Sequence, residues 1–207
     1  MVANLVSAEE KKAVSETGLV AYWSFDEGKG NDGIIEGDVN WVKGFALEFN
    51  GEEGYVDCGD NSSLDMPTND FTVEVWVKSN GWTKSSIISK GSWFNQGKGY
   101  DISYPENPKN IYFNIYDGSK YYPLKTTLGE TFPWSHIVGV RRGGTVEVWV
   151  NGAKEQSIDY PTTSISNSEN LYIGRGLNGF IDEVKIYNHA LTAEEIKTNY
   201  LKSIPAP

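Results

Sequence analysis

A glycine-rich stretch, residues 91–100, carries side chains suited to chemistry with a sugar. It reads Gly-Ser-Trp-Phe-Asn-Gln-Gly-Lys-Gly-Tyr. Flat aromatic rings stack on the apolar faces of pyranoses, while amides and carboxylates bind the hydroxyls. Trp93 and Tyr100 are therefore candidate ligand contacts, and the same surface is expected to include tyrosines of neighbouring strands: Tyr104, Tyr116 and Tyr121, with Tyr122 beside them. The alternative is that these tyrosines only cover sheet surface.

Asp182 is the polar residue with the most specific setting. Strict alternation along residues 180–186 places it on the same face as Phe180, Val184 and Ile186. If that face is the core, Asp182 is a buried carboxylate, which requires either a cation or several hydrogen bonds. Both alternatives, a metal or bonds from turn amides, are open at this point.

The pentapeptide Val-Glu-Val-Trp-Val occurs twice, once with Glu74 and Trp76 and once with Glu147 and Trp149. Two strands that meet the same demand for one buried and one outer face explain this better than an internal repeat. Exposed, the two tryptophans would form a platform for sugars. The preferred interpretation is that they belong to a buried layer.

Catalytic patterns are absent from the sequence. His136 and His189 have no nearby serine or cysteine arrangement that suggests a triad, and no spacing for a zinc site. Both are expected to be structural. Cys58 is the only cysteine, so no disulfide within the chain is possible, and it is expected to be a small buried residue.

Short stretches of alternating apolar and polar residues predict the strands that position these side chains. Turns such as Asn50-Gly51 and Asn151-Gly152 separate many of them. A short helix is expected before residue 18, and the capping box Thr192-Ala-Glu-Glu195 begins a second one. The predicted strands cover residues 19–25, 46–49, 54–58, 71–78, 86–90, 100–104, 110–116, 134–141, 145–150, 170–173 and 179–187. This spacing favours an all-β, antiparallel sandwich.

The amino-acid composition limits the kinds of partner that the protein is expected to bind. The 207 residues include 18 Lys and Arg against 28 Asp and Glu, a formal charge of −10. Such a surface repels phosphate backbones, so nucleic acid is excluded as an expected partner. No run approaches the ~18 apolar residues of a membrane span. The length suits one sandwich domain, expected over 18–203, with a helical stub or linker at 1–17 and a tail at 204–207.

Several segments in order resemble laminin G-like members of the concanavalin A-like lectin/glucanase superfamily. They begin with Gly-Leu-Val-Ala-Tyr-Trp-Ser-Phe-Asp-Glu-Gly at 18–28 and continue with Ala-Leu-Glu-Phe-Asn-Gly at 46–51. The middle is Phe-Thr-Val-Glu-Val-Trp-Val at 71–77, and the end is Asn-Gly-Phe-Ile-Asp-Glu-Val-Lys-Ile-Tyr at 178–187. The resemblance covers roughly 18–201. It implies a jelly roll of two sheets, an extracellular location, binding of glycans or proteins, and a structural calcium.

The resemblance also implies where calcium would bind. Pairing of the first and last strands would bring Asp26 close to Asp182, and Asn31 or Asp32 would add an oxygen. The loop after Gly28 is shorter here than is usual in the family. Laminarinase-like enzymes of this fold use a Glu-x-Asp-x-x-Glu run, which this chain lacks.

The sequence therefore predicts a non-catalytic module, secreted or on the cell surface, that binds carbohydrate or a surface protein. Its targeting segment is expected to lie outside this sequence. The alternative is a structural or adhesin subunit whose partners include copies of itself, and a glycoside hydrolase of the same fold ranks third.

Overall fold

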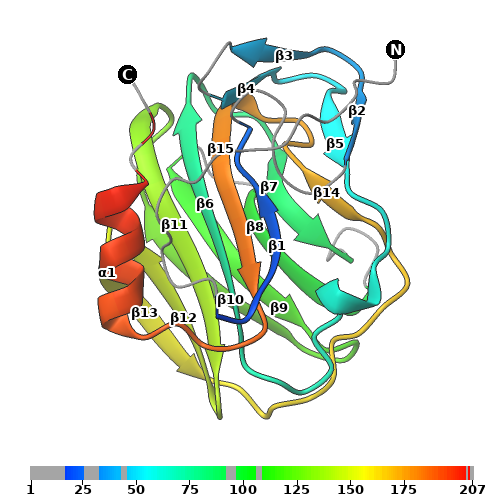
Figure 1. Cartoon of the computed structure of the whole chain (residues 1–207), viewed down its shortest axis with the longest axis vertical. Helices are drawn as coiled ribbons and strands as arrows, with labels where there is room; N and C mark the ends of the chain where they lie inside the picture. The colour runs from blue at the N-terminus through cyan, green and yellow to red at the C-terminus, as the bar shows by residue number, and fades with distance from the viewer. Residues whose placement is uncertain are drawn as a thin grey trace.

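The structure, a computed structural model, describes residues 17–25, 33–42, 46–91, 97–105, 109–203 and 205. These form two antiparallel β-sheets that pack face to face (Figure 1). The predicted all-β antiparallel sandwich is confirmed. The expected helix before residue 18 falls almost wholly outside the described residues. No helix among the described residues is long and apolar enough to cross a membrane.

Sheet A carries the C-terminal strand at its centre. In spatial order it contains β13 (Ala153–Asp159), β12 (Thr145–Val150), β11 (Phe132–Arg142), β6 (Phe71–Ser79), β15 (Asn178–Tyr187), β4 (Ala46–Asn50) and β3 (Val39–Val42). The first strand, β1 (Leu19–Trp23), pairs antiparallel with the second half of β15, with Trp23 opposite Val184. The expected pairing of the first and last strands is thus confirmed.

Sheet B packs on sheet A through its inner face. Its spatial order is β10 (Tyr121–Thr127), β9 (Asn110–Tyr116), β8 (Gly99–Tyr104), β7 (Ser85–Lys90), β14 (Leu171–Ile173), β5 (Tyr55–Asp57) and β2 (Ile34–Glu36). A short 3₁₀ turn, η1 (Ser62–Leu64), follows β5 and is capped by the Asn61 side chain.

The core lies between the two sheets, where alternation directs every second residue inward. From β9 it receives Ile111, Phe113 and Ile115, all fully buried. The Phe113 ring packs so closely on Gly139 of β11 that a Cβ at position 139 would overlap it. The missing side chain at Gly139 therefore lets the two sheets approach closely here. A fully buried side chain such as Phe113 contributes about 1.5–3 kcal/mol to the stability of the fold.

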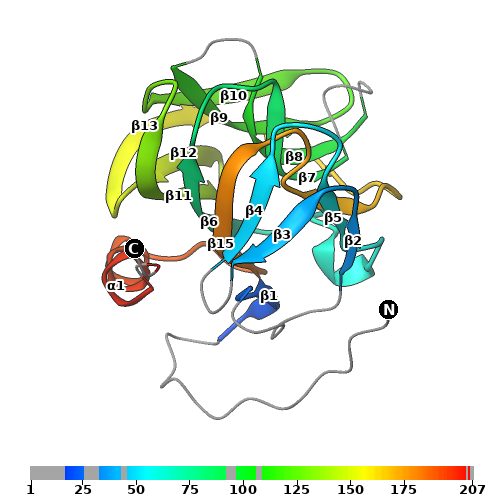
Figure 2. The same ribbon diagram turned by 90° about the horizontal axis from the view of Figure 1, so that it is seen from above.

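Helix α1 (Ala193–Lys202) lies outside sheet A (Figure 2). The predicted capping box is present, because Thr192 and Glu195 each accept a hydrogen bond from the backbone N–H of the other. Helix α1 buries Ile196 and Asn199, and its Tyr200 ring stacks on Trp76 of β6 with centroids 5.6 Å apart. Trp149, the tryptophan of the second pentapeptide, is also buried and belongs to a cluster with Ile196 of α1. Both tryptophans therefore lie in a second buried layer, as the sequence interpretation favoured, and form no exposed platform.

The sequence prediction missed the strands at all four sheet edges. Three of these edge strands, β2, β3 and β13, contain no fully buried residue, so they lack the buried alternation of central strands. Strand β10 contains Pro123, which an edge strand tolerates because one side needs no hydrogen-bond donors. The missed strands are β2, β3, β10 and β13.

Candidate ligand-binding site

The outer face of sheet B is polar, although its central strands are deeply buried. Strand β8 directs Tyr100, Ile102 and Tyr104 into the core, so Asp101 and Ser103 face outward. Strands β7 and β9 add three more small polar side chains to this face. We call this set the polar floor: Ser86, Ser89, Asp101, Ser103 and Asn114, each less than a tenth exposed.

Hydrogen bonds within the polar floor are incomplete. The Asn114 amide nitrogen donates to Asp101 Oδ1 at 2.7 Å and to Ser103 Oγ at 3.0 Å. Burial raises the pKa of Asp101 to about 6, against the lowering effect of Ser103 and Asn114. Asn114 Oδ1 and Ser86 Oγ have no hydrogen-bond partner among the described residues. A buried polar atom without a partner is unfavourable, and because these atoms are covered by the protein, an enclosed water is the partner that would satisfy them.

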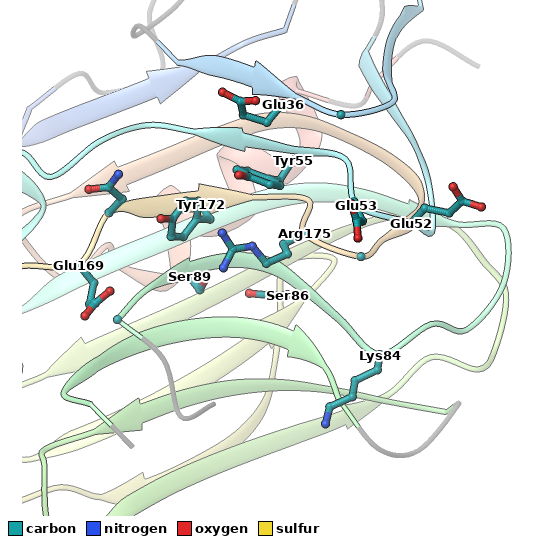
Figure 3. Close-up of a pocket in the computed structure, with 14 residues that line it drawn as sticks. Glu36, Glu52, Glu53, Tyr55, Lys84, Ser86, Ser89, Glu169, Tyr172 and Arg175 are labelled. Atoms are coloured by element: carbon teal, nitrogen blue, oxygen red, sulfur yellow. The ribbon is translucent and has the colours of Figure 1, made fainter. Parts of the chain in front are cut away.

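A pocket of about 700 Å³ opens beside this floor, over β2, β5, β14 and β7 (Figure 3). Its volume lies within the ~300–1,000 Å³ of typical ligand sites. Two floor residues, Ser86 and Ser89, belong to its lining. The other lining residues are Glu36, Gly37, Glu52, Glu53, Tyr55, Lys84, Gly91, Glu169, Asn170, Tyr172, Arg175 and Gly176.

Arg175 occupies the middle of the pocket. Its Cζ lies 3.8 Å from the centroid of the Tyr172 ring and 4.7 Å from that of Tyr55. The two tyrosines meet edge to face, with centroids 5.5 Å apart. In Figure 3 the arginine side chain points toward Tyr172, and Ser86 and Ser89 lie close by in this view.

Four glutamates form the rim of the pocket: Glu36, Glu52, Glu53 and Glu169, all exposed. Ionised carboxylates only accept hydrogen bonds, so they suit hydroxyl donors. Lys84 is the second cation of the lining and is also exposed. The pocket thus combines acceptors at its rim with a donor-rich cation at its centre.

The predicted aromatic contacts are divided by the structure. Tyr100 and Tyr104 are buried in the core, where their hydroxyls donate to the carbonyls of Leu64 and Gly129. The expectation that these two rings offer a face to a ligand is therefore wrong, because their strand alternation points them inward. Trp93 lies outside the described residues.

Tyr116 and Tyr121 do face outward from sheet B. They are directly opposite each other in the β9–β10 pair, and both are partly exposed. Tyr122, one residue on, points inward and packs edge to face on Tyr160. Tyr116 and Tyr121 therefore remain candidate contacts, at the opposite side of this face from the pocket.

Asp182 is buried, with 4% of its surface exposed, but not on the face that alternation predicted. Ile181 and Val184 both reach the core, because a bulge interrupts β15 between Asp182 and Lys185. Glu183 has φ of 50° there, and its N–H donates to Asp182 Oδ1 at 2.8 Å. The bulge marks the point where β15 changes partner from β4 to β1.

Of the residues predicted to bind calcium, only Asp182 lies within the described part of the chain. Asp26 and Asn31 lie outside the described residues, so their distance from Asp182 is not defined. The described residues contain no group of three His, Cys, Asp or Glu side chains that would hold a metal. The calcium site remains a prediction.

His136 and Glu74 lie together in the layer beneath α1, away from the polar floor. His136 Nε2 is 3.6 Å from the Glu74 carboxylate, and both side chains are 1% exposed. Asn199 of α1 donates to the same carboxylate at 3.0 and 3.1 Å. The arrangement anchors a helix and leaves no access for a substrate, which agrees with the expected structural role of His136.

Sequence reasoning missed Arg175 and its two tyrosines. The alternation of Tyr55 with Val56, and of Tyr172 with Ile173, would have placed both rings on an outer face. Their proximity could not be read, because strands β5 and β14 are far apart in sequence and meet only in the sheet.

A comparison with models of known protein families shows which family this chain belongs to. The family described as the concanavalin A-like lectin/glucanases superfamily, laminin G type, matches residues 50–197. The chain belongs to this superfamily. No curated protein matches it in sequence.

Solved structures agree on the fold. The receptor-binding domain of botulinum neurotoxin D matches with a TM-score of 0.72 at 16% identity, over 91% of this chain and 53% of that one. The binding domain of Paraclostridial Mosquitocidal Protein 1 matches at 0.73 and 20% identity, over 89% and 52%. The binding domain of botulinum neurotoxin DC, in complex with SialylT, matches at 0.73 and 13%, over 92% and 52%. This chain spans about half the length of each.

Proposed function

We propose that this superfamily member is a non-catalytic carbohydrate-binding module whose ligand lies on the outer face of sheet B. The observation that carries the proposal is the pocket beside the polar floor, where two tyrosine rings, a central cation and exposed carboxylates converge. Sugars require this combination, because their hydroxyls bind polar groups and their ring faces contact aromatic ones.

Two considerations support binding over hydrolysis. A retaining glucanase needs two carboxylates about 5–5.5 Å apart, one of them a raised-pKa acid. Asp101 has a raised pKa, but its carboxylate is covered and bonded to Asn114. The rim glutamates are exposed, and the chain lacks the Glu-x-Asp-x-x-Glu run of laminarinase-like enzymes. The three solved structures compared above are binding or receptor-binding domains, and one is a complex with SialylT. The proposal includes a location at the cell surface or outside the cell.

The test is a glycan array, followed by calorimetry with the strongest ligand. Tyr172→Ala should weaken binding about tenfold or more, since an aromatic anchor is often worth 1–2 kcal/mol or more. Tyr121→Ala, on the other side of the same face, reports whether the ligand extends that far. Trp41→Ala is the control: Trp41 is 47% exposed on edge strand β3 of sheet A, and its loss should leave affinity unchanged.

No binding to any glycan would overturn the proposal and favour the alternative of an assembly or adhesin subunit. Sedimentation over a concentration series would then report self-association. Release of reducing ends from a polysaccharide panel would favour the hydrolase instead.

A further inference from the structure

We infer that Arg175 binds an acidic group, so that the preferred ligand is a glycan with a single carboxylate or sulfate among its hydroxyls. This inference rests on the proposed function and deepens it. It starts from the guanidinium, which has five N–H donors in a planar fork and no acceptor.

Among the described residues, the guanidinium has no anionic partner. Its Cζ lies over the rings of Tyr55 and Tyr172, and none of the ion pairs within the described residues includes it, although four glutamates line the same pocket. Because the two rings are nearly perpendicular, the guanidinium lies flat against at most one of them, and its remaining N–H edges are available to other partners. Those edges match a carboxylate or sulfate in a bidentate arrangement.

A rigid turn holds Arg175 in this position. Gly174 and Gly176 flank it with φ of 80° and 74°, and a Cβ on Gly174 would overlap the Phe49 ring. The Arg175 carbonyl accepts from Ser86 N at 2.9 Å, and Gly174 N donates to the Ile87 carbonyl at 2.9 Å. The turn is thereby tied to β7. A side chain whose backbone is fixed loses less freedom on binding, which favours affinity.

The glutamates restrict the charge of the ligand without excluding an acid. All four are exposed to solvent, which weakens their repulsion of an acid bound at the guanidinium. A bidentate contact at the guanidinium is direct and much stronger. A polyanion would meet the rim repeatedly and be repelled, whereas a glycan with one acidic group would present hydroxyls to the rim.

The experiment uses paired glycans on the array: carboxylated glycans with their carboxyl methyl esters, and monosulfated glycans with their desulfated forms. The strongest pair is then titrated by calorimetry. The acidic form should bind the unmodified protein at least tenfold more tightly than its neutral form. Arg175→Gln should abolish that preference. Arg175→Lys, which keeps the charge but loses the fork, should reduce it several-fold.

Lys84→Gln is the matched control, because it removes the other cation of the lining and should leave most of the preference intact. All variants should keep the unfolding transition of the unmodified protein, since both side chains are exposed. Preference for the carboxylated or the sulfated pair identifies the acidic group. Equal binding of acidic and neutral forms, or a preference that survives Arg175→Gln, would overturn the inference but leave the proposed function standing. Failure of every glycan to bind would overturn both.

Discussion

Replacing Glu74 by Ala should destabilise the protein by about 3 kcal/mol, because it removes the centre of the buried network that holds α1 on sheet A. Breaking a buried charge network by loss of one member typically costs about 3–5 kcal/mol. The lower figure applies here, because Lys185, 3.6 Å from Glu74, keeps its 2.6 Å ion pair with Glu183. Tyr187 would lose its acceptor, and Asn199 would keep only its 3.3 Å hydrogen bond to the Tyr187 hydroxyl.

Glu147 provides a matched control within the same chain. It occupies the same place in an identical pentapeptide and is also buried, but its ionic partners, Arg142 and Lys154, are 38% and 47% exposed. Its carboxylate also accepts from Trp149 Nε1 at 3.0 Å. Exposed ion pairs contribute only about 0–1 kcal/mol and the lost acceptor of Trp149 about 1 kcal/mol, so Glu147→Ala should have the smaller effect, about 1–2 kcal/mol.

Urea denaturation at pH 7 measures both free energies of unfolding, and a double-mutant cycle isolates the contact between Glu74 and the helix. Glu74→Ala and Asn199→Ala should be coupled by about 1.5–3 kcal/mol, the usual range for a hydrogen bond to a charged group. Coupling near zero, or equal losses for Glu74→Ala and Glu147→Ala, would refute the reasoning.

The stability that Glu74 contributes depends on pH, and the direction of that dependence follows from its pKa. Burial by itself raises the pKa of Glu74, but the contact with His136 and the charge of Lys185 hold it below its usual value. A lowered folded-state pKa contributes stability above the unfolded value of about 4.5, and this is lost as the pH falls through the folded value. Glu74→Gln should therefore remove part of the acid sensitivity below pH 4.5.

Three further predictions concern other parts of the fold. Asp101→Asn should gain stability relative to the unmodified protein as the pH rises from about 4 to 6, by at most roughly 3 kcal/mol. The reason is that the raised pKa of about 6 makes ionised Asp101 unfavourable in the folded protein. A difference in urea midpoints that does not change with pH would contradict this. Gly139→Ala should destabilise by about 1–3 kcal/mol through overlap with Phe113, and Phe113→Leu should recover part of that loss in thermal melts, unless the clash is relieved elsewhere. If calcium binds at Asp182, EDTA should lower the melting temperature and calcium restore it, whereas Asp182→Ala should abolish the response and cost about 2–4 kcal/mol; an EDTA-insensitive melt would leave the hydrogen-bonded alternative.

The second buried layer, beneath α1, shows why the sequence alone could not tell the surroundings of Glu74 from those of Glu147. Glu74 and Glu147 are indistinguishable in sequence, because each stands in Val-Glu-Val-Trp-Val. Only the tertiary structure decides that the first lies next to His136 of β11 and Asn199 of α1, and that the second pairs with the partly exposed Arg142 and Lys154. A pattern with period two shows which residues share a face, but not what covers that face.

The sequence by itself determined the sandwich and its central strands. Strands such as β6 and β11 are buried on both sides by neighbours, so their composition and alternation are strongly constrained and readable. It also determined the start of α1, because the capping box formed by Thr192 and Glu195 is a local interaction among four consecutive residues.

The tertiary structure alone decided the edges, the bulge and the ligand pocket. Edge strands carry little apolar pattern, and one extra residue at Asp182–Glu183 reverses which side chains face the core. The pocket brings Tyr55 against Tyr172 and Arg175, which lie more than a hundred residues further along the chain. Contacts of that range depend on strand order, and strand order follows from packing the whole chain rather than from any local pattern of residues.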